Sequence, residues 1–142
     1  MCFTSPPYYD LEVYSKADMS ALGTYEEFME QYRNIFQQCY DMMCDGSFAV
    51  LKVAEIRNKK TGANRCFVAD NVKLMCDIGF TFYNDIVLVN TVGTGAIRAN
   101  KQMATRKVVK VHQNVLVFYK GNLKDISTKY PELTFEDIED AD

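Results

Sequence analysis

Apolar side chains recur at helical spacing over residues 25–43, where they follow an i, i+3, i+4, i+7 order among charged and amide positions. Thr24 and Glu27 stand three residues apart at the start of this stretch, the interval of a capping box. The pattern predicts an amphipathic helix that ends near Asp45-Gly46. A second helix is expected over about residues 67–78, with Gly79 as its stop signal.

Three apolar runs without helical spacing, residues 48–56, 82–91 and 114–120, are expected to form buried strands. A short apolar run at residues 1–4 leads into Pro6 and Pro7, which end any strand because proline has no N–H for a sheet ladder. Polar loops are expected over residues 57–65 and 92–113. Strands alternating with amphipathic helices predict an α/β protein, with a buried, mostly parallel sheet and helices on its faces. Such sheets bind ligands beyond the carboxyl ends of their strands, so the loops that follow the strands are the candidate sites.

Length and composition agree with this picture and exclude several alternatives. The chain has 142 residues, 48% of them apolar and 25% charged, as expected for one globular domain. Its apolar runs are far shorter than the roughly 18 residues of a membrane span, and no basic, apolar leader opens it. Five cysteines without C-x-x-C spacing suggest neither a disulfide framework nor a metal site. We therefore expect a cytoplasmic protein with reduced thiols, no metal and no membrane contact.

Charge is unevenly distributed along the chain. Residues 1–124 carry 15 Lys+Arg against 12 Asp+Glu, whereas residues 125–142 carry one lysine and seven acids. No acidic residue lies between Asp85 and Asp125. We expect the basic side chains of this segment to bind a nucleic acid backbone. The best candidates for phosphate contacts are Arg98, Lys101, Arg106, Lys107 and Lys110. A solvated basic loop is the alternative interpretation, and the acidic residues 125–142 are expected to form a flexible tail.

The tetrapeptide Ser5-Pro6-Pro7-Tyr8 follows the first expected strand and has a specific chemical use. The prolines hold the turn rigid, and the Ser5 hydroxyl and Pro6 carbonyl can both act as hydrogen-bond acceptors. Two convergent acceptors suit an exocyclic amino group, and the Tyr8 ring suits a planar base that stacks on it. Adenine and cytosine have such an amino group, and an enzyme reaches it in duplex DNA by flipping the base out.

Residues 3–11 resemble the catalytic motif of DNA amino-methyltransferases, the family that methylates adenine N6 or cytosine N4. Further segments resemble that family in the same order, most closely the methylases of phages and prophages: residues 45–50, 79–90 and 112–121. The resemblance covers about residues 1–124. It implies part of an S-adenosylmethionine-dependent methyltransferase sheet, Rossmann-like and mostly parallel with an antiparallel last strand.

The resemblance also implies a mechanism, namely direct transfer of a methyl group from S-adenosylmethionine to the base amino nitrogen. Ser5 and Pro6 would then orient the nitrogen, Pro7 would hold the turn, and Tyr8 would hold the flipped base. Tyr9 and Asp10 continue the motif and would line the base pocket. Such an enzyme would serve in restriction-modification.

The cofactor half of that family, with its glycine-rich turn, has no clear counterpart in these 142 residues. The segment Val92-Gly93-Thr94-Gly95 is a weak candidate, because no acid follows until Asp125 and the residues after it do not look helical. We therefore expect residues 1–124 to be a catalytic, C-terminal half that needs a cofactor-binding partner chain or self-association. Alone, such a half would leave a strand edge and an apolar face uncovered.

Three other functions stay open at this point. A non-catalytic DNA-binding subunit, or an inactive fragment, would explain the missing glycine turn. An RNA amino-methyltransferase would use the same amino-group chemistry. An enzyme that binds a dinucleotide through Gly93 and Gly95 is the weakest alternative.

Overall fold

The computed structural model of the chain describes residues 1–11, 23–90, 93 and 95–132. Its strands are β1 (Cys2–Thr4), β2 (Ser47–Val53), β3 (Thr81–Val89) and β4 (His112–Lys120). Its α-helices are α1 (Tyr25–Met42), α2 (Phe67–Ile78), α3 (Gly95–Met103) and α4 (Ile126–Lys129). Short 3-10 turns, η1 (Tyr9–Leu11) and η4 (Leu123–Asp125), follow β1 and β4.

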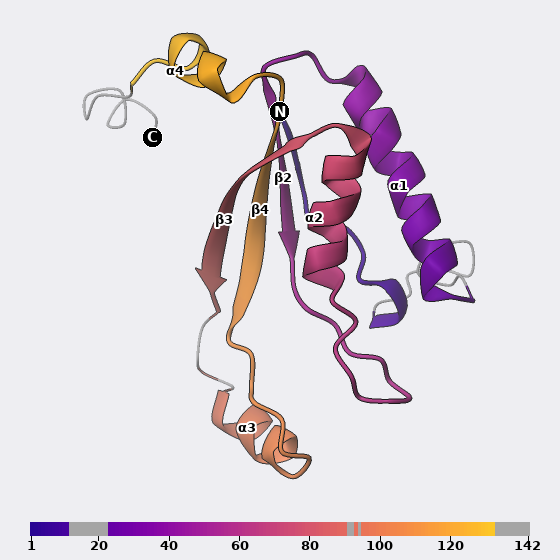
Figure 1. The fold of residues 1–142 in the computed structure, drawn as a ribbon. Helices are drawn as coiled ribbons and strands as arrows, with labels where there is room; N and C mark the ends of the chain where they lie inside the picture. The colour runs from indigo at the N-terminus through magenta and orange to yellow at the C-terminus, as the bar shows by residue number, and fades with distance from the viewer. Residues whose placement is uncertain (12–22, 91–92, 94, 133–142) are drawn as a thin grey trace.

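The four strands form one sheet in the order β1-β2-β4-β3. β1 pairs in parallel with β2, and β4 lies antiparallel between β2 and β3. The first three strands therefore point the same way, and only the last strand is reversed. This confirms the α/β class and the mostly parallel sheet with an antiparallel last strand. The carboxyl ends of β1, β2 and β3 meet at one end of the sheet, the lower end in Figure 1.

Helices α1 and α2 pack against each other and cover one face of the sheet (Figure 1). Alternate residues of β2 point into this core: Ala49, Leu51 and Val53 are buried, whereas the residues between them are partly exposed. The capping box predicted from the sequence is present, because the Thr24 hydroxyl accepts from the Glu27 N–H and the Glu27 carboxylate accepts from the Thr24 N–H. Both predicted helices are confirmed, and α2 has the predicted bounds.

The prediction that the third strand is buried was wrong. All of β3 except Phe82 is exposed, and Ile86, Val87, Leu88 and Val89 keep between 42% and 66% of their surface. The physical reason is position, because within the described part of the chain β3 is an edge strand that pairs only with β4. A continuous apolar run predicts burial on two faces, but it carries no information about whether a covering layer is present.

The prediction that residues 92–113 form a loop was also wrong in part. Residues Gly95–Met103 form the helix α3, although the pattern after the Gly-Thr-Gly segment does not indicate a helix. The helix is mostly exposed and lies beyond the carboxyl end of β3 (Figure 1). Alanine, arginine, lysine, glutamine and methionine are good helix formers, so intrinsic propensity explains this helix better than a buried stripe does. Val92 and Thr94 lie outside the described residues.

The segment after β4 packs at the end of the sheet where β2 begins. The Tyr130 hydroxyl donates to the Gly46 carbonyl at 2.8 Å, and its ring lies 5.3 Å from the ring of Phe48. The Lys129 ammonium donates to the Asp45 carbonyl at 2.7 Å. Residues 133–142, most of the predicted acidic tail, lie outside the described residues. The boundary at residue 124 stays a prediction.

Candidate functional site

The Ser5–Tyr8 turn lies at the carboxyl end of β1, beside the carboxyl end of β2. Parallel pairing puts Thr4 opposite Leu51, so the chain leaves both strands at the same level. The Ser5 hydroxyl donates to the Lys52 carbonyl at 3.3 Å, and the Tyr8 hydroxyl donates to the same oxygen at 3.4 Å. One backbone carbonyl of β2 therefore fixes both ends of the turn.

The hydrogen bond of Ser5 decides what its side chain can do. Because the hydroxyl proton is directed at Lys52, the oxygen lone pairs are left to accept a hydrogen bond from another group. Ser5 is exposed, so a ligand can reach this oxygen. The adjacent Pro6 is buried and Pro7 is partly buried, which anchors the turn on the core.

Tyr8 and Tyr9 are both largely inside the protein, with exposed fractions of 9% and 7%. The Tyr8 ring packs at 6.0 Å from the ring of Phe67, the first residue of α2. Tyr9 has a φ of +48°, a left-handed conformation that is unfavourable for a residue with a side chain. Its ring lies 5.5 Å from Tyr25 and 5.4 Å from Phe28, so packing in the core holds this conformation in place.

Arg65 belongs to this cluster and is not among the site residues predicted from the sequence. Its guanidinium lies 4.8 Å from the ring centroid of Tyr9 and 5.0 Å from that of Tyr25. Among the described residues, its Nε is buried without a hydrogen-bond partner. Tyr9 and Tyr25 lie 40 or more positions before Arg65 in the sequence. The contact could therefore not be predicted, and the sequence shows only an arginine in a polar loop.

Asp10 connects the turn to the loop of residues 57–65. The Lys59 ammonium lies 3.6 Å from the Asp10 carboxylate and also donates to the Asp10 carbonyl. The pair is partly exposed, so we assign it little stabilising energy. Its position shows that the Ser5 turn and this loop lie next to each other. The predicted role of Asp10 in a base pocket stays a prediction.

Glu55 supports the start of α2 from outside the helix. Its carboxylate Oε1 accepts from the backbone N–H of Phe67 at 2.9 Å and of Ile56 at 3.2 Å. The residue before the helix, Cys66, makes no side-chain cap and has a φ of +62°. Glu55 therefore supplies the acceptor that a capping side chain would give, and its negative charge suits a helix N-terminus.

Two tyrosine hydroxyls on α1 join this helix to α2. The Tyr25 hydroxyl donates to the Asp70 carboxylate at 2.7 Å, and the Tyr32 hydroxyl donates to the Asn71 carbonyl oxygen at 2.7 Å. Burial, followed by the bond to Asp70, raises the pKa of Tyr25 far above its ordinary value. Burial also raises the pKa of Tyr32. Both phenols therefore stay neutral at every physiological pH and act as structural donors.

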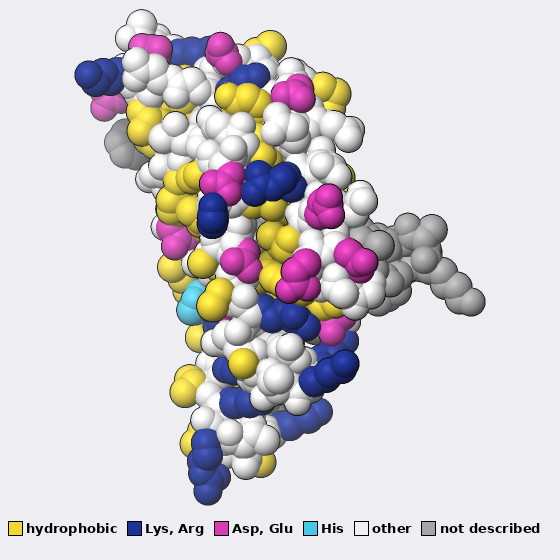
Figure 2. All heavy atoms as spheres, turned by 45° about the vertical axis from the view of Figure 1, so that its right-hand side comes forward, with side chains coloured by type: hydrophobic (Ala, Val, Ile, Leu, Met, Phe, Trp, Pro, Cys, Tyr) yellow, Lys and Arg dark blue, Asp and Glu magenta, His cyan; other side chains and the backbone are white. Residues whose placement is uncertain are grey.

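The five predicted phosphate-binding residues gather beyond the same end of the sheet. Arg98 and Lys101 lie on α3, and the other three, Arg106, Lys107 and Lys110, lie between α3 and β4. All but the partly buried Lys107 are exposed. Figure 2 shows lysine and arginine side chains concentrated at the lower end of the molecule, where Figure 1 places α3. The structure thus brings these residues to the end of the sheet that carries the Ser5 turn.

A cavity of about 240 Å³ lies directly beside Ser5, between β1 and α1. Apolar groups, cysteines and the turn itself line it: Cys2, Thr4, Ser5, Pro6, Pro7, Tyr32, Ile35, Phe36 and Cys39. This lining holds no carboxylate, although the ribose of S-adenosylmethionine presents two hydroxyl donors and its sulfonium is cationic. The described residues around the turn therefore do not fit the cofactor by themselves.

All five cysteines are free thiols. Within the described residues, no group of three or more metal-ligating side chains is brought together. Over the same residues, no helix has the length and apolar content to cross a membrane.

The sheet order and the position of the turn agree with the methyltransferase sheet that the sequence predicts, and comparison with solved structures supports this fold. The chain is similar to TTHA0409, a candidate DNA modification methylase from Thermus thermophilus, with TM-scores of 0.62 for the selenomethionine derivative and 0.59 for the complex with S-adenosyl-L-methionine. Sequence identity is 17% in both cases. The alignment covers 97% of this chain and 49% of TTHA0409, so the chain spans about half the length of the structures that it matches.

A family model described as DNA methylase matches residues 1–139. The chain therefore belongs to the N6/N4 DNA methylase family, which confirms the resemblance seen in the sequence. No curated protein matches the sequence.

Proposed function

We propose that this chain supplies the catalytic part of an S-adenosylmethionine-dependent DNA methyltransferase that modifies the exocyclic amino group of a flipped adenine or cytosine. The observation that carries the proposal is the Ser5–Tyr8 turn at the carboxyl end of β1. The hydroxyl proton of Ser5 is already bonded to the Lys52 carbonyl. Family membership supports the same chemistry.

In this proposal the chain acts by positioning. The Ser5 oxygen accepts a hydrogen bond from the base amino group and so directs the nitrogen lone pair away from the turn. As positive charge develops on that nitrogen, the same oxygen stabilises it. Tyr8 is largely buried and supports the turn from the core side, and the Lys52 carbonyl holds Ser5 and Tyr8 together.

The cofactor-binding half comes from another segment or another chain in this proposal. Three observations support it: the lining of the cavity beside Ser5 does not suit the cofactor, β1 is an edge strand, and Phe3 on β1 is 64% exposed. TTHA0409, which is about twice as long, has been solved with S-adenosyl-L-methionine. A further strand paired to the free edge of β1 would extend the sheet beside Ser5, and elements packed on the face opposite α1 and α2 would cover Phe3.

The test is methyl transfer to DNA by the complete enzyme, which here means this chain together with its cofactor-binding half. Calorimetry measures the binding of S-adenosylmethionine to this chain alone and to the complete enzyme. We expect Ser5→Ala to lower the transfer rate about 10²–10³-fold, as for other positioned hydrogen-bonding groups. Because Ser5 is exposed, its loss should leave the fold intact, and Ser47→Ala at the opposite end of β2 is the matched control. Full activity of Ser5→Ala and Tyr8→Ala would refute the assignment of the turn.

A non-catalytic DNA-binding subunit is the second candidate, favoured by the lining of the cavity beside Ser5. It predicts DNA binding without methyl transfer under every combination of partner and cofactor. Tight binding of S-adenosylmethionine by this chain alone would refute both the need for a partner and this second candidate.

A further inference from the structure

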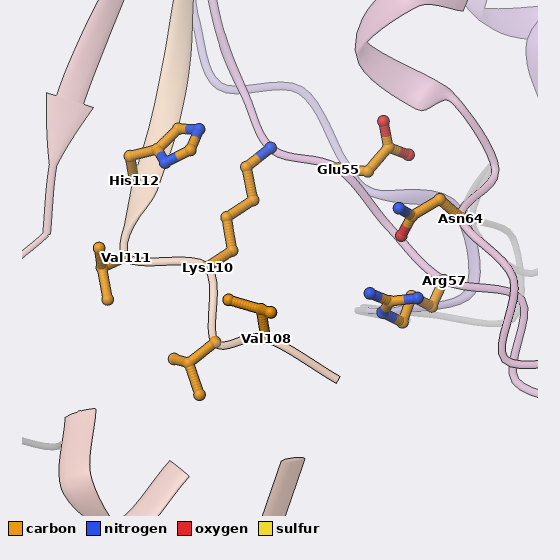
Figure 3. A pocket seen from close by; sticks show the side chains of 8 residues that line it. Glu55, Arg57, Asn64, Val108, Lys110, Val111 and His112 are labelled. Carbon is orange, nitrogen blue, oxygen red and sulfur yellow. The ribbon is translucent and has the colours of Figure 1, made fainter. Parts of the chain in front are cut away.

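A cavity of about 390 Å³ lies between the loop of residues 57–64 and the segment of residues 108–112, which leads into β4 (Figure 3). It is separate from the cavity beside Ser5 and shares no lining residue with it. Glu55, Arg57 and Asn64 line it from the β2 side, and Val108–His112 line it from the β4 side. Of these residues, only Lys110 was predicted from the sequence to contact a ligand.

The loop of residues 57–64 is held in one conformation by its own hydrogen bonds. Its backbone closes through Gly62 N–H to Asn58 O at 2.8 Å and Asn58 N–H to Ala63 O at 2.9 Å. The Asn58 side chain accepts from the N–H groups of Lys60 and Thr61, and Arg57 donates to the Gly62 carbonyl at 3.0 Å. A turn fixed in this way loses little conformational entropy on binding.

The two walls of the cavity are close to each other at the loop tip. A Cβ atom on Gly62 would lie 2.9 Å from the Lys107 ammonium nitrogen, so this lysine reaches across from the α3 side to the loop. Gly62 has a φ of +75° as well, which makes glycine the suitable residue there. The basic segment after α3 and the loop therefore form one continuous surface.

Valines line part of the cavity, and every polar side chain in its lining except Glu55 can donate a hydrogen bond. Figure 3 shows Arg57 and Asn64 extending from one side, with Lys110 and His112 on the other. The one acid in the lining, Glu55, turns toward α2, where its carboxylate accepts from the N–H groups of Ile56 and Phe67. The lining thus contributes two cations, Arg57 and Lys110, and its one carboxylate is already hydrogen-bonded.

We propose that this cavity holds a backbone phosphate of the DNA, so that the DNA-binding surface includes the loop of residues 57–64 as well as the segment around α3. The inference rests on the proposed DNA methyltransferase function. Arg57 offers the planar fork that matches two phosphate oxygens, Lys110 supplies a point charge, and the Asn64 amide donates to a further oxygen. Glu55 in the lining follows Lys52 by three positions, and the Lys52 carbonyl accepts from Ser5, so the cavity and the turn both lie at the carboxyl end of β2.

The test is the salt dependence with which the full chain binds a fluorescein-labelled DNA duplex, measured by anisotropy. Each phosphate contact contributes about 0.9 to the slope of log K against log salt. We expect Arg57→Gln and Lys110→Gln each to weaken binding at low salt, and the double variant to reduce the slope by about 0.9, because both side chains contact the same phosphate. Lys124→Gln is the matched control. It removes an equal charge from the exposed turn η4, at the end of β4 opposite to the cavity, and should leave the slope unchanged.

Two variants keep the test decisive. If Arg57→Gln unfolds its loop, as a loss of helical and sheet signal would show, Lys110→Gln still removes a contact from the opposite wall. Unchanged slopes in a chain that binds duplex would overturn the phosphate site and leave the proposed function standing. A wild-type chain that binds no duplex would overturn the phosphate site alone, because methyl transfer by the complete enzyme tests the proposed function separately.

Discussion

Lys120 offers a quantitative test of how the end of β4 holds helix α1. Its ammonium donates to the carbonyls of Tyr40 and Met43 at 2.8 Å each and lies 4.3 Å from the Tyr40 ring centroid. The last turn of α1 contains no basic residue of its own. Lys120, only 13% exposed, therefore brings a cation and hydrogen-bond donors to the carbonyls at the helix C-terminus.

Replacing Lys120 with methionine keeps the stem of the side chain and removes the donors. Hydrogen bonds from a charged group contribute about 1.5–3 kcal/mol, and a partly buried cation at a helix C-terminus contributes up to about 2 kcal/mol. These contributions overlap because they involve the same carbonyls. We therefore expect Lys120→Met to lower the free energy of unfolding by about 2–3 kcal/mol.

Urea unfolding followed by circular dichroism measures this difference, with Lys73→Met as the matched control. Lys73 is 75% exposed and pairs at 2.7 Å with Asp77 on the surface of α2. Its replacement should cost only about 0.3–0.5 kcal/mol, as for other exposed i,i+4 pairs. If the two variants differ by less than about 0.5 kcal/mol, the inferred role of Lys120 at the helix end is refuted.

Two further predictions concern α1 and α2. Tyr32→Phe removes the hydroxyl that donates to buried Asn71 and should destabilise the chain by about 1–3 kcal/mol in urea unfolding. Recovery of part of that loss in Tyr32→Phe/Asn71→Leu would support the reason, and an unchanged single variant would contradict it. Hydrogen bonds from Lys73 and Arg33 hold the pKa of Asp77 below its ordinary value, so its contribution to stability is present above the unfolded-state pKa and is lost as pH falls. Carboxyl NMR titration should show that Lys73→Met raises this pKa, and no change on substitution would oppose the assignment.

The parts of the fold that local patterns encode were predictable. The capping box at Thr24 and the periodic apolar face of α1 lie within one segment, and both helices appear where that pattern indicated. The exposure of β3 was not predictable, because edge position depends on which other strands are present. Helix α3 was missed because it has no buried apolar stripe, and glycines at its start suggested a loop.

Part of the candidate site could also be predicted from local sequence, and part of it could not. The turn of Ser5 to Tyr8 could be recognised because its residues are consecutive. The contact of Arg65 with Tyr9 and Tyr25 could not, since it joins three segments separated in sequence. Nor could the shared acceptor of Ser5 and Tyr8, which is a backbone carbonyl and leaves no mark on the residue type at position 52.

The most direct test of the proposed function is mass spectrometry of nucleosides from DNA treated with the complete enzyme and S-adenosylmethionine. We expect N6-methyladenine or N4-methylcytosine, lost in the Ser5→Ala enzyme and retained in the Ser47→Ala enzyme. Methylation of a ring carbon, or an amino-methylated product formed equally well by Ser5→Ala, would contradict it.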